Sequence, residues 1–141
     1  MILLDTNVVS EPLKRHSDPE VLAWLDAQAV ETLYLSTISL AELRFGIAAL
    51  PNGKRKDTLR LSLDQRIMPV FEDRVLPFDV EAAETYGALR ARVKAAGRAI
   101  GTADGYIAAI AVARNLIVAT RNTSPFEFAG LPVINPWEAR Q

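Results

Sequence analysis

The chain has 141 residues, with 16 Lys and Arg against 17 Asp and Glu, a net charge of −1 and no cysteine. This length predicts a single domain over residues 1–141, and the lack of cysteine excludes disulfides, zinc fingers, thiolate nucleophiles and iron–sulfur clusters. No apolar run approaches the roughly 20 residues of a membrane helix, and the first residues lack the basic segment of a signal peptide, so we expect a cytoplasmic protein. The balanced charge argues against a nucleic-acid-binding domain, because such domains are often strongly basic.

Short apolar runs recur along the chain and are the candidate strands. The first, Ile2 to Leu4, shows no alternation of polar and apolar residues, which is typical of a strand buried on both faces in a parallel sheet. Pro77 lies in the third run and predicts an edge position or a strand end. The predicted strands cover residues 2–4, 33–36, 75–78, 116–119 and 131–134.

Helical patterns separate these runs. Asp18, Pro19 and Glu20 are typical of a helix start, and Ser39 predicts the start of a second helix that ends before the turn at 51–53. The other predicted helices cover residues 54–71, 80 to about 96, and 102–115. Helices that alternate with strands predict an α/β fold around a mostly parallel sheet.

Polar side chains follow two of the predicted strands. Asp5 comes directly after the first strand, and Thr120, Arg121 and Asn122 follow the fourth. Ligands of open parallel sheets bind beyond the carboxyl ends of the strands, so these side chains mark the expected site.

Two further acids stand in apolar helical surroundings. Glu42 lies between Leu40 and Leu43. Asp104 lies three residues before Ile107, so Asp104 shares the inward-facing stripe of its helix. Carboxylates buried near one another need protons or a cation, because burying unpaired charge is costly. If Asp5, Glu42 and Asp104 converge, they form a site for Mg²⁺ or Mn²⁺ that can hydrolyse a phosphodiester.

Structural roles explain the same acids without a metal. Ser39 and Glu42 fit the Ser-x-x-Glu capping box, in which the glutamate bonds back to the start of its own helix. Asp104 fits the first turn of a helix, where a negative charge is stabilised by the helix dipole, and Asp5 fits the cap of a short helix. Both interpretations stay open, and a capping role can coexist with a metal role.

No other catalytic set has its parts in this sequence. His16 is the one histidine and lies in a polar segment, so neither a Ser-His-Asp triad nor a zinc site is supported. Glycine-rich nucleotide-binding motifs are absent, and the basic residues between Lys54 and Arg60 are most typical of a solvated helix face.

Four ordered segments carry a resemblance to a known family. They are residues 2–12, which contain Asp5-Thr6-Asn7; residues 36–46, Ser-Thr-Ile-Ser-Leu-Ala-Glu-Leu-Arg-Phe-Gly; residues 103–111, Ala-Asp-Gly-Tyr-Ile-Ala-Ala-Ile-Ala; and residues 119–122, Ala-Thr-Arg-Asn, which lead to Val-Ile-Asn-Pro-Trp at 133–137. Together they resemble the PIN-domain ribonucleases, in particular the VapC toxins of type II toxin–antitoxin systems and their FitB-like branch.

The resemblance implies a PIN fold, with a mostly parallel sheet of four or five strands flanked by helices. It implies an endoribonuclease that depends on Mg²⁺ or Mn²⁺, with Asp5, Glu42 and Asp104 as the catalytic and metal-binding acids. It further implies a homodimer that a small VapB-like antitoxin neutralises. The other end of such an antitoxin binds operator DNA.

Four more residues at the site have supporting roles in this hypothesis. Thr6 and Thr120 orient the carboxylates through hydroxyl hydrogen bonds, and Asn122 takes a weaker orienting or ligand role. Arg121 either contacts RNA phosphate or forms a structural ion pair.

One departure from the family pattern concerns charge. Many relatives carry a further acid after the fourth strand, where this chain has Asn122 and Pro125. An amide oxygen can coordinate a metal but contributes no charge, which favours one well-held ion over two. The alternative function is therefore a PIN-like protein with weak catalysis that acts as a binding partner in an antitoxin–DNA complex.

Overall fold

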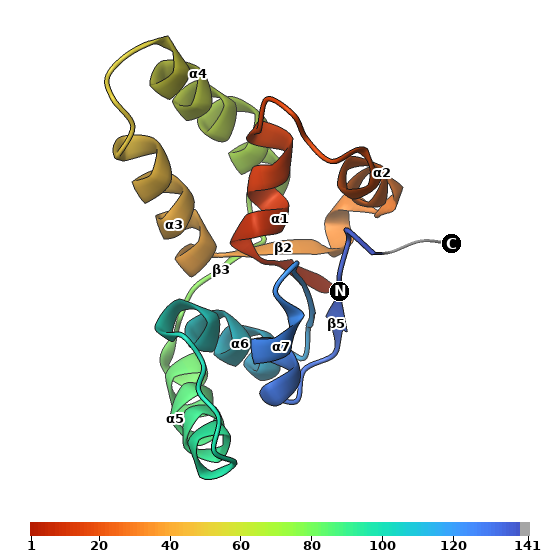
Figure 1. Cartoon of the computed structure of the whole chain (residues 1–141), viewed down its shortest axis with the longest axis vertical. Helices are drawn as coiled ribbons and strands as arrows, with labels where there is room; N and C mark the ends of the chain where they lie inside the picture. Colours follow the sequence, from red (N-terminus) through yellow and green to blue (C-terminus); the bar gives the residue numbers. More distant parts are fainter. Residues whose placement is uncertain (139–141) are drawn as a thin grey trace.

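A five-stranded parallel sheet forms the centre of the computed structural model, which describes residues 1–138 (Figure 1). The strands lie in the order β3-β2-β1-β4-β5, and all four pairings are parallel. They are β1 (Ile2–Leu4), β2 (Leu33–Ser36), β3 (Val75–Leu76), β4 (Ile117–Ala119) and β5 (Val133–Ile134). The predicted α/β fold is confirmed, and β3 holds the edge position that Pro77 indicates.

Helices cover both faces of this sheet. Figure 1 shows α5, α6 and α7 below the sheet and α1, α2, α3 and α4 above it. Their bounds are α1 (Thr6–Ser10), α2 (Pro19–Ala27), α3 (Thr37–Ala48), α4 (Lys54–Ser62), α5 (Val80–Ala95), α6 (Thr102–Arg114) and α7 (Thr123–Phe128). No helix within residues 1–138 is both long enough and apolar enough to cross a membrane.

The core consists of two hydrophobic clusters, one on each side of the sheet. Leu3 of β1 packs into the cluster that α5, α6 and α7 supply, whereas Ile2 and Leu4 pack into the cluster with α1 and α3. This division follows from the two-residue period of a strand, which points successive side chains to opposite faces. All residues of β1 are buried, as the unbroken apolar run predicts.

The start of α3 differs from the prediction. The hydroxyl of Ser36 accepts the main-chain N–H of Ser39 at 3.0 Å, so Ser36 is the N-cap and the predicted start at Ser39 is wrong. Since β2 ends at Ser36, the chain passes from strand to helix without a loop.

The polar helix predicted over residues 54–71 is also different, because it consists of three segments. These are α4, a π-helical turn η3 (Leu63–Ile67) and a 3₁₀ turn η4 (Met68–Phe71). Pro69 has no N–H to donate, so a regular α-helix cannot continue through this point. The short α7 was not predicted.

Candidate active site

The carboxyl ends of β1 and β4 bring Asp5 and Thr120 together. Asp5 is the N-cap of α1, where its Oδ1 accepts the N–H of Thr6 at 2.8 Å, and its Oδ2 accepts the hydroxyl of Thr120 at 2.8 Å. Asp5 is 5% exposed and Thr120 is fully buried. The capping role considered for Asp5 is therefore present, and both of its carboxylate oxygens are held in place.

The hydroxyl of Thr120 is the centre of a small hydrogen-bond network. It also accepts the main-chain N–H of Asn122 at 3.1 Å and the side-chain N–H of Asn7 at 3.4 Å. Asn7 Oδ1 in turn accepts the main-chain N–H of Arg121 at 3.3 Å. Asn122 thus joins the network through its main chain, and Asn7, for which no role was predicted, links the two strand ends.

Glu42 approaches the same place from α3. Its Oε1 accepts the hydroxyl of Thr6 at 2.6 Å, and the Oγ atoms of Thr6 and Ser39 lie 2.9 Å apart. Because a hydroxyl has one proton, Ser39 donates to Thr6 when Thr6 donates to Glu42. The capping-box interpretation of Glu42 is wrong, since Ser36 caps α3 and Glu42 binds a residue of α1 instead.

Asp104 lies in the first turn of α6 and is partly buried. Burial raises the pKa of Asp104, and the charge of Glu42 raises it further. Burial also raises the pKa of Asp5; the hydrogen bonds from Thr120 and Thr6 oppose this shift, while the charges of Asp104 and Glu42 add to it. The three acids, from three different elements, therefore lie within reach of one another's charge.

No positive side chain neutralises this cluster in the described part of the chain, where Asp5, Glu42 and Asp104 form no ion pair. Unpaired carboxylates of this kind are the oxygen donors that Mg²⁺ and Mn²⁺ bind. Within residues 1–138, however, no three Asp, Glu, His or Cys side chains have the spacing to hold an ion by themselves. The donor set fits a hydrated ion, because Mg²⁺ usually keeps several waters beside one or two carboxylates.

Arg121 lies at the edge of the site and is exposed. Its guanidinium carbon is 5.1 Å from the centre of the Trp137 ring. The structural ion pair considered for Arg121 is not found among the described residues. The guanidinium therefore keeps its N–H donors available for a ligand.

Comparison with known proteins identifies the family of this chain. The family model of the PIN domain matches residues 2–131. The chain belongs to the PIN-domain family. The PIN fold that the resemblance implies is confirmed.

Individual proteins match this chain along almost its whole length. The plasmid stability protein StbB of Pseudomonas syringae is 60% identical, over 99% of this chain and 100% of its own length. The VapC ribonuclease Y4jK of Sinorhizobium fredii is 58% identical over 98% and 99%, and toxin FitB of Neisseria gonorrhoeae is 51% identical over 97% and 99%. The resemblance to VapC and FitB proteins is confirmed.

Two solved structures have the same fold. The crystal structure of FitAcB from Neisseria gonorrhoeae has a TM-score of 0.95 and 51% identity, covering 98% of this chain and 99% of that one. The structure of FitAB bound to the IR36 DNA fragment has a TM-score of 0.96 and 48% identity, covering 100% and 99%.

Proposed function

We propose that this PIN-domain chain is a metal-dependent endoribonuclease and the toxin of a toxin–antitoxin pair. The observation that carries the proposal is the meeting of Asp5, Glu42 and Asp104 beyond the strand ends without a neutralising cation among the described residues. The names of the relatives support it, because one is called a VapC ribonuclease and another toxin FitB.

In this proposal Asp5 and Asp104 hold Mg²⁺ or Mn²⁺, directly or through water, and Glu42 is the third carboxylate. When bound, the ion polarises the scissile phosphate and lowers the pKa of the attacking water. Asn122 stands in place of a further acid, so the negative charge of the site comes from three carboxylates and favours one well-held ion.

The protein's own side chains keep the acids oriented for this chemistry. Thr120 and the N–H of Thr6 hold the two oxygens of Asp5, and the hydroxyl of Thr6 holds Glu42. Thr6 therefore couples the positions of two acids from different helices. Glu42 is exposed, and in the proposed reaction it accepts a proton from the water that attacks phosphorus. The bond between phosphorus and the sugar oxygen then breaks, and the sugar oxygen takes up a proton from solvent water.

An RNA cleavage assay tests this function. Purified protein, freed of any partner, is incubated with structured RNA and Mn²⁺ or Mg²⁺, with and without EDTA. We expect cleavage that both EDTA and Asp5→Asn abolish, whereas the control Asp26→Asn, an exposed acid on α2, keeps it. Cleavage that survives both the chelator and Asp5→Asn refutes the metal mechanism.

The proposed partner is a small antitoxin of the VapB type, through which the pair binds operator DNA, and the proposed assembly is a homodimer. The similar FitAB structure, bound to a DNA fragment, supports a complex of this kind. A tagged chain co-expressed with the neighbouring small reading frame should retain that product through purification. Free passage of the small protein through the column contradicts the partnership.

A second candidate function is that of a binding partner with weak catalysis in an antitoxin–DNA complex. Asn122, at a position where many PIN toxins carry an acid, favours this alternative. A folded protein that cleaves no RNA with either metal, yet still forms a DNA-binding complex with its antitoxin, establishes it.

A further inference from the structure

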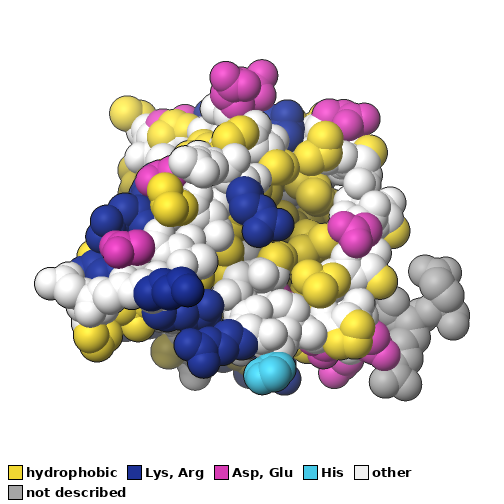
Figure 2. Space-filling model, turned by 90° about the horizontal axis from the view of Figure 1, so that it is seen from above, with side chains coloured by type: hydrophobic (Ala, Val, Ile, Leu, Met, Phe, Trp, Pro, Cys, Tyr) yellow, Lys and Arg dark blue, Asp and Glu magenta, His cyan; other side chains and the backbone are white. Residues whose placement is uncertain are grey.

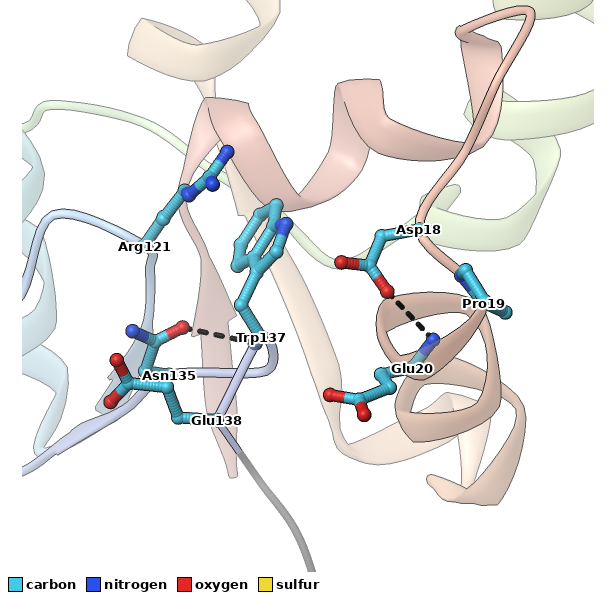
Figure 3. Close-up of a pocket in the computed structure, with 7 residues that line it drawn as sticks. All are labelled: Asp18, Pro19, Glu20, Arg121, Asn135, Trp137 and Glu138. Carbon is cyan, nitrogen blue, oxygen red and sulfur yellow. Dashed lines mark hydrogen bonds between the residues drawn. The ribbon is translucent and has the colours of Figure 1, made fainter.

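A cavity of about 550 Å³ opens beside the proposed nuclease site. Figure 3 shows Arg121 and the indole of Trp137 along one side of it, and the start of α2, from Asp18 to Glu20, along the other. Asn135 and Glu138 complete the lining near the base of Trp137. A space of this volume is large enough for a small ring compound.

The cavity is connected to the acids through adjacent residues. Arg121 follows directly after Thr120, whose hydroxyl donates to Asp5. The main-chain N–H of Arg121 donates to Asn7, which also donates to Thr120. Arg121 therefore both lines the cavity and belongs to the segment that holds Asp5 in place.

One side of the cavity offers a flat aromatic surface and a positive charge. The backbone at Trp137 is held by its main-chain N–H, which donates to Asn135 Oδ1 at 3.0 Å, and the side chain packs against the hydrophobic core. The Arg121 guanidinium, 5.1 Å from the centre of the indole ring, forms no ion pair among the described residues. Indole rings stack on nucleobases, and guanidinium groups bind phosphate, so this side suits a nucleotide.

The opposite side offers hydrogen-bond acceptors. Asp18 Oδ1 accepts the N–H of Glu20 at 2.8 Å as the cap of α2, and no described residue binds Oδ2. The carboxylate of Glu138 also has no described partner. Ionised carboxylates only accept hydrogen bonds and repel phosphate, so the part of a nucleotide that faces them carries N–H donors and no negative charge.

Guanine is the RNA base that meets this requirement best, because its N1–H and N2–H₂ donors are adjacent and match one carboxylate. We propose that the cavity binds a guanine next to the scissile phosphate, stacked on Trp137, with Arg121 at the phosphate and Asp18 or Glu138 at the base edge. This inference rests on the proposed nuclease function and names the feature of the RNA that the site selects.

Binding is tested without any cleavage step. The chain has 2 tryptophans, so the variant Trp24→Phe leaves Trp137 as the single fluorescent indole. Titration with guanosine 5′-monophosphate should quench this fluorescence at concentrations at least about fivefold lower than inosine 5′-monophosphate, which lacks the N2 amino group. The proposal is overturned if both nucleotides quench the fluorescence at the same concentration, or if neither quenches it.

Cleavage kinetics give a second and separable test. Trp137→Ala should raise KM for a guanine-containing RNA about tenfold or more with a smaller change in kcat, and Trp137→Phe should restore most of the loss. Asp18→Asn keeps a good cap for α2 but should reduce the preference for guanine over inosine at the cut site, whereas Asp26→Asn should not. Unchanged KM and preference in these variants overturn the subsite while leaving the nuclease function intact.

The two proposals fail in different ways. A wild-type protein that cleaves no RNA refutes the nuclease function, and the nucleotide titration still decides whether the cavity binds guanine. A third outcome is that the cavity variants keep RNA binding and cleavage but bind a partner protein more weakly. This outcome assigns the cavity to the partner protein and overturns the guanine site.

Discussion

The hydroxyl of Thr120 connects the end of β4 to the carboxylate that follows β1. This hydroxyl donates a hydrogen bond to Asp5 Oδ2 and accepts one from the main-chain N–H of Asn122. We expect Thr120→Val to lower the free energy of unfolding by about 1–3 kcal/mol, because buried polar groups lose their partner. Urea unfolding measures this change. Thr120→Ser keeps the hydroxyl and serves as the control, so an equal loss in both variants contradicts the hydrogen-bond explanation.

The environment of Asp104 predicts how the stability of the protein depends on pH. Burial and the charge of Glu42 raise the pKa of Asp104 above the ordinary 3.8, so folding favours the protonated carboxyl group. The stability that this group contributes is fully present below pH 3.8, and it is lost as pH rises through the folded-state pKa. In EDTA at pH 7, Asp104→Asn should therefore be more stable than wild type, because it removes a partly buried negative charge beside Glu42. The difference should shrink as pH falls towards 3.8.

Asp79 provides the control of opposite sign. The N–H of Ala82 and the nearby Arg114 lower the pKa of Asp79. Asp79→Asn keeps an N-cap for α5 but should destabilise the protein at neutral pH, and this loss should disappear as pH falls. The stabilities of Asp104→Asn and Asp79→Asn, relative to wild type, should differ in sign at neutral pH in urea unfolding. If both variants are stabilised or both are destabilised, the opposite pKa directions of the two carboxyl groups are contradicted.

The contact between α5 and α6 supplies a prediction at the scale of elements. A Cβ added at Gly105 of α6 meets Tyr86 Cε1 at 2.9 Å, and the Tyr86 ring is itself packed against Tyr106 with ring centres 4.9 Å apart. We expect Gly105→Ala to destabilise the protein by about 1–3 kcal/mol through overpacking, as measured by thermal or urea unfolding.

A second glycine gives a matched control. Gly87 lies within α5, and nothing is within 4 Å of a Cβ placed there. Gly87→Ala should stabilise the protein by about 0.5–1 kcal/mol, because alanine loses less backbone entropy in a helix. A loss of stability in both variants contradicts the packing argument.

The elements that could be predicted are those with strong local signals. β1 follows from an apolar run, and α5 follows from Asp79, whose Oδ1 accepts the N–H of Ala82 at 2.9 Å. The start of α3 could not be decided locally, because Ser36 and Ser39 are equally good caps. The choice depends on where β2 ends, and Ser36 is paired with Leu76 of β3, far along the chain.

The site could be predicted only in part for the same reason. Asp5 is marked by its place after an apolar strand, but the Thr6–Glu42 hydrogen bond joins residues 36 positions apart. It depends on how α3 packs against α1, which no local pattern specifies. Asn7 was missed although it belongs to the Asp-Thr-Asn run, because its partner Thr120 comes from the end of β4.

At the scale of the whole molecule, the balanced net charge is a poor guide to binding. Figure 2 shows Lys and Arg side chains side by side near the histidine, while the acids are scattered over the same face. Arg55 of α4 donates to the carbonyl of Leu13 at 3.2 Å, which brings the start of α4 to the basic residues Lys14 and Arg15. Local potential can thus favour phosphate although the charges of the chain nearly cancel.

The proposed homodimer leads to a prediction about the outer surface. Phe45 of α3 is 74% exposed, which is unusual for a large aromatic side chain. We expect Phe45→Ser to weaken self-association about tenfold or more without loss of stability, as measured by sedimentation velocity over a range of concentrations. Val112→Ser, at a 41% exposed site on α6, is the control. A wild-type protein that is monomeric at every concentration contradicts the homodimer.

The position of β1 at the centre of the sheet has a consequence for biosynthesis. Asp5 leaves the ribosome 115 residues before Thr120, the residue that holds its Oδ2, and β4 pairs with β1 in the finished sheet. Until β4 has emerged, the nascent chain has an incomplete sheet and a carboxylate without its orienting partner. We therefore expect products released by premature termination before residue 120 to be inactive. A cell that makes this protein is then exposed to the proposed activity only after residue 120 has been synthesised.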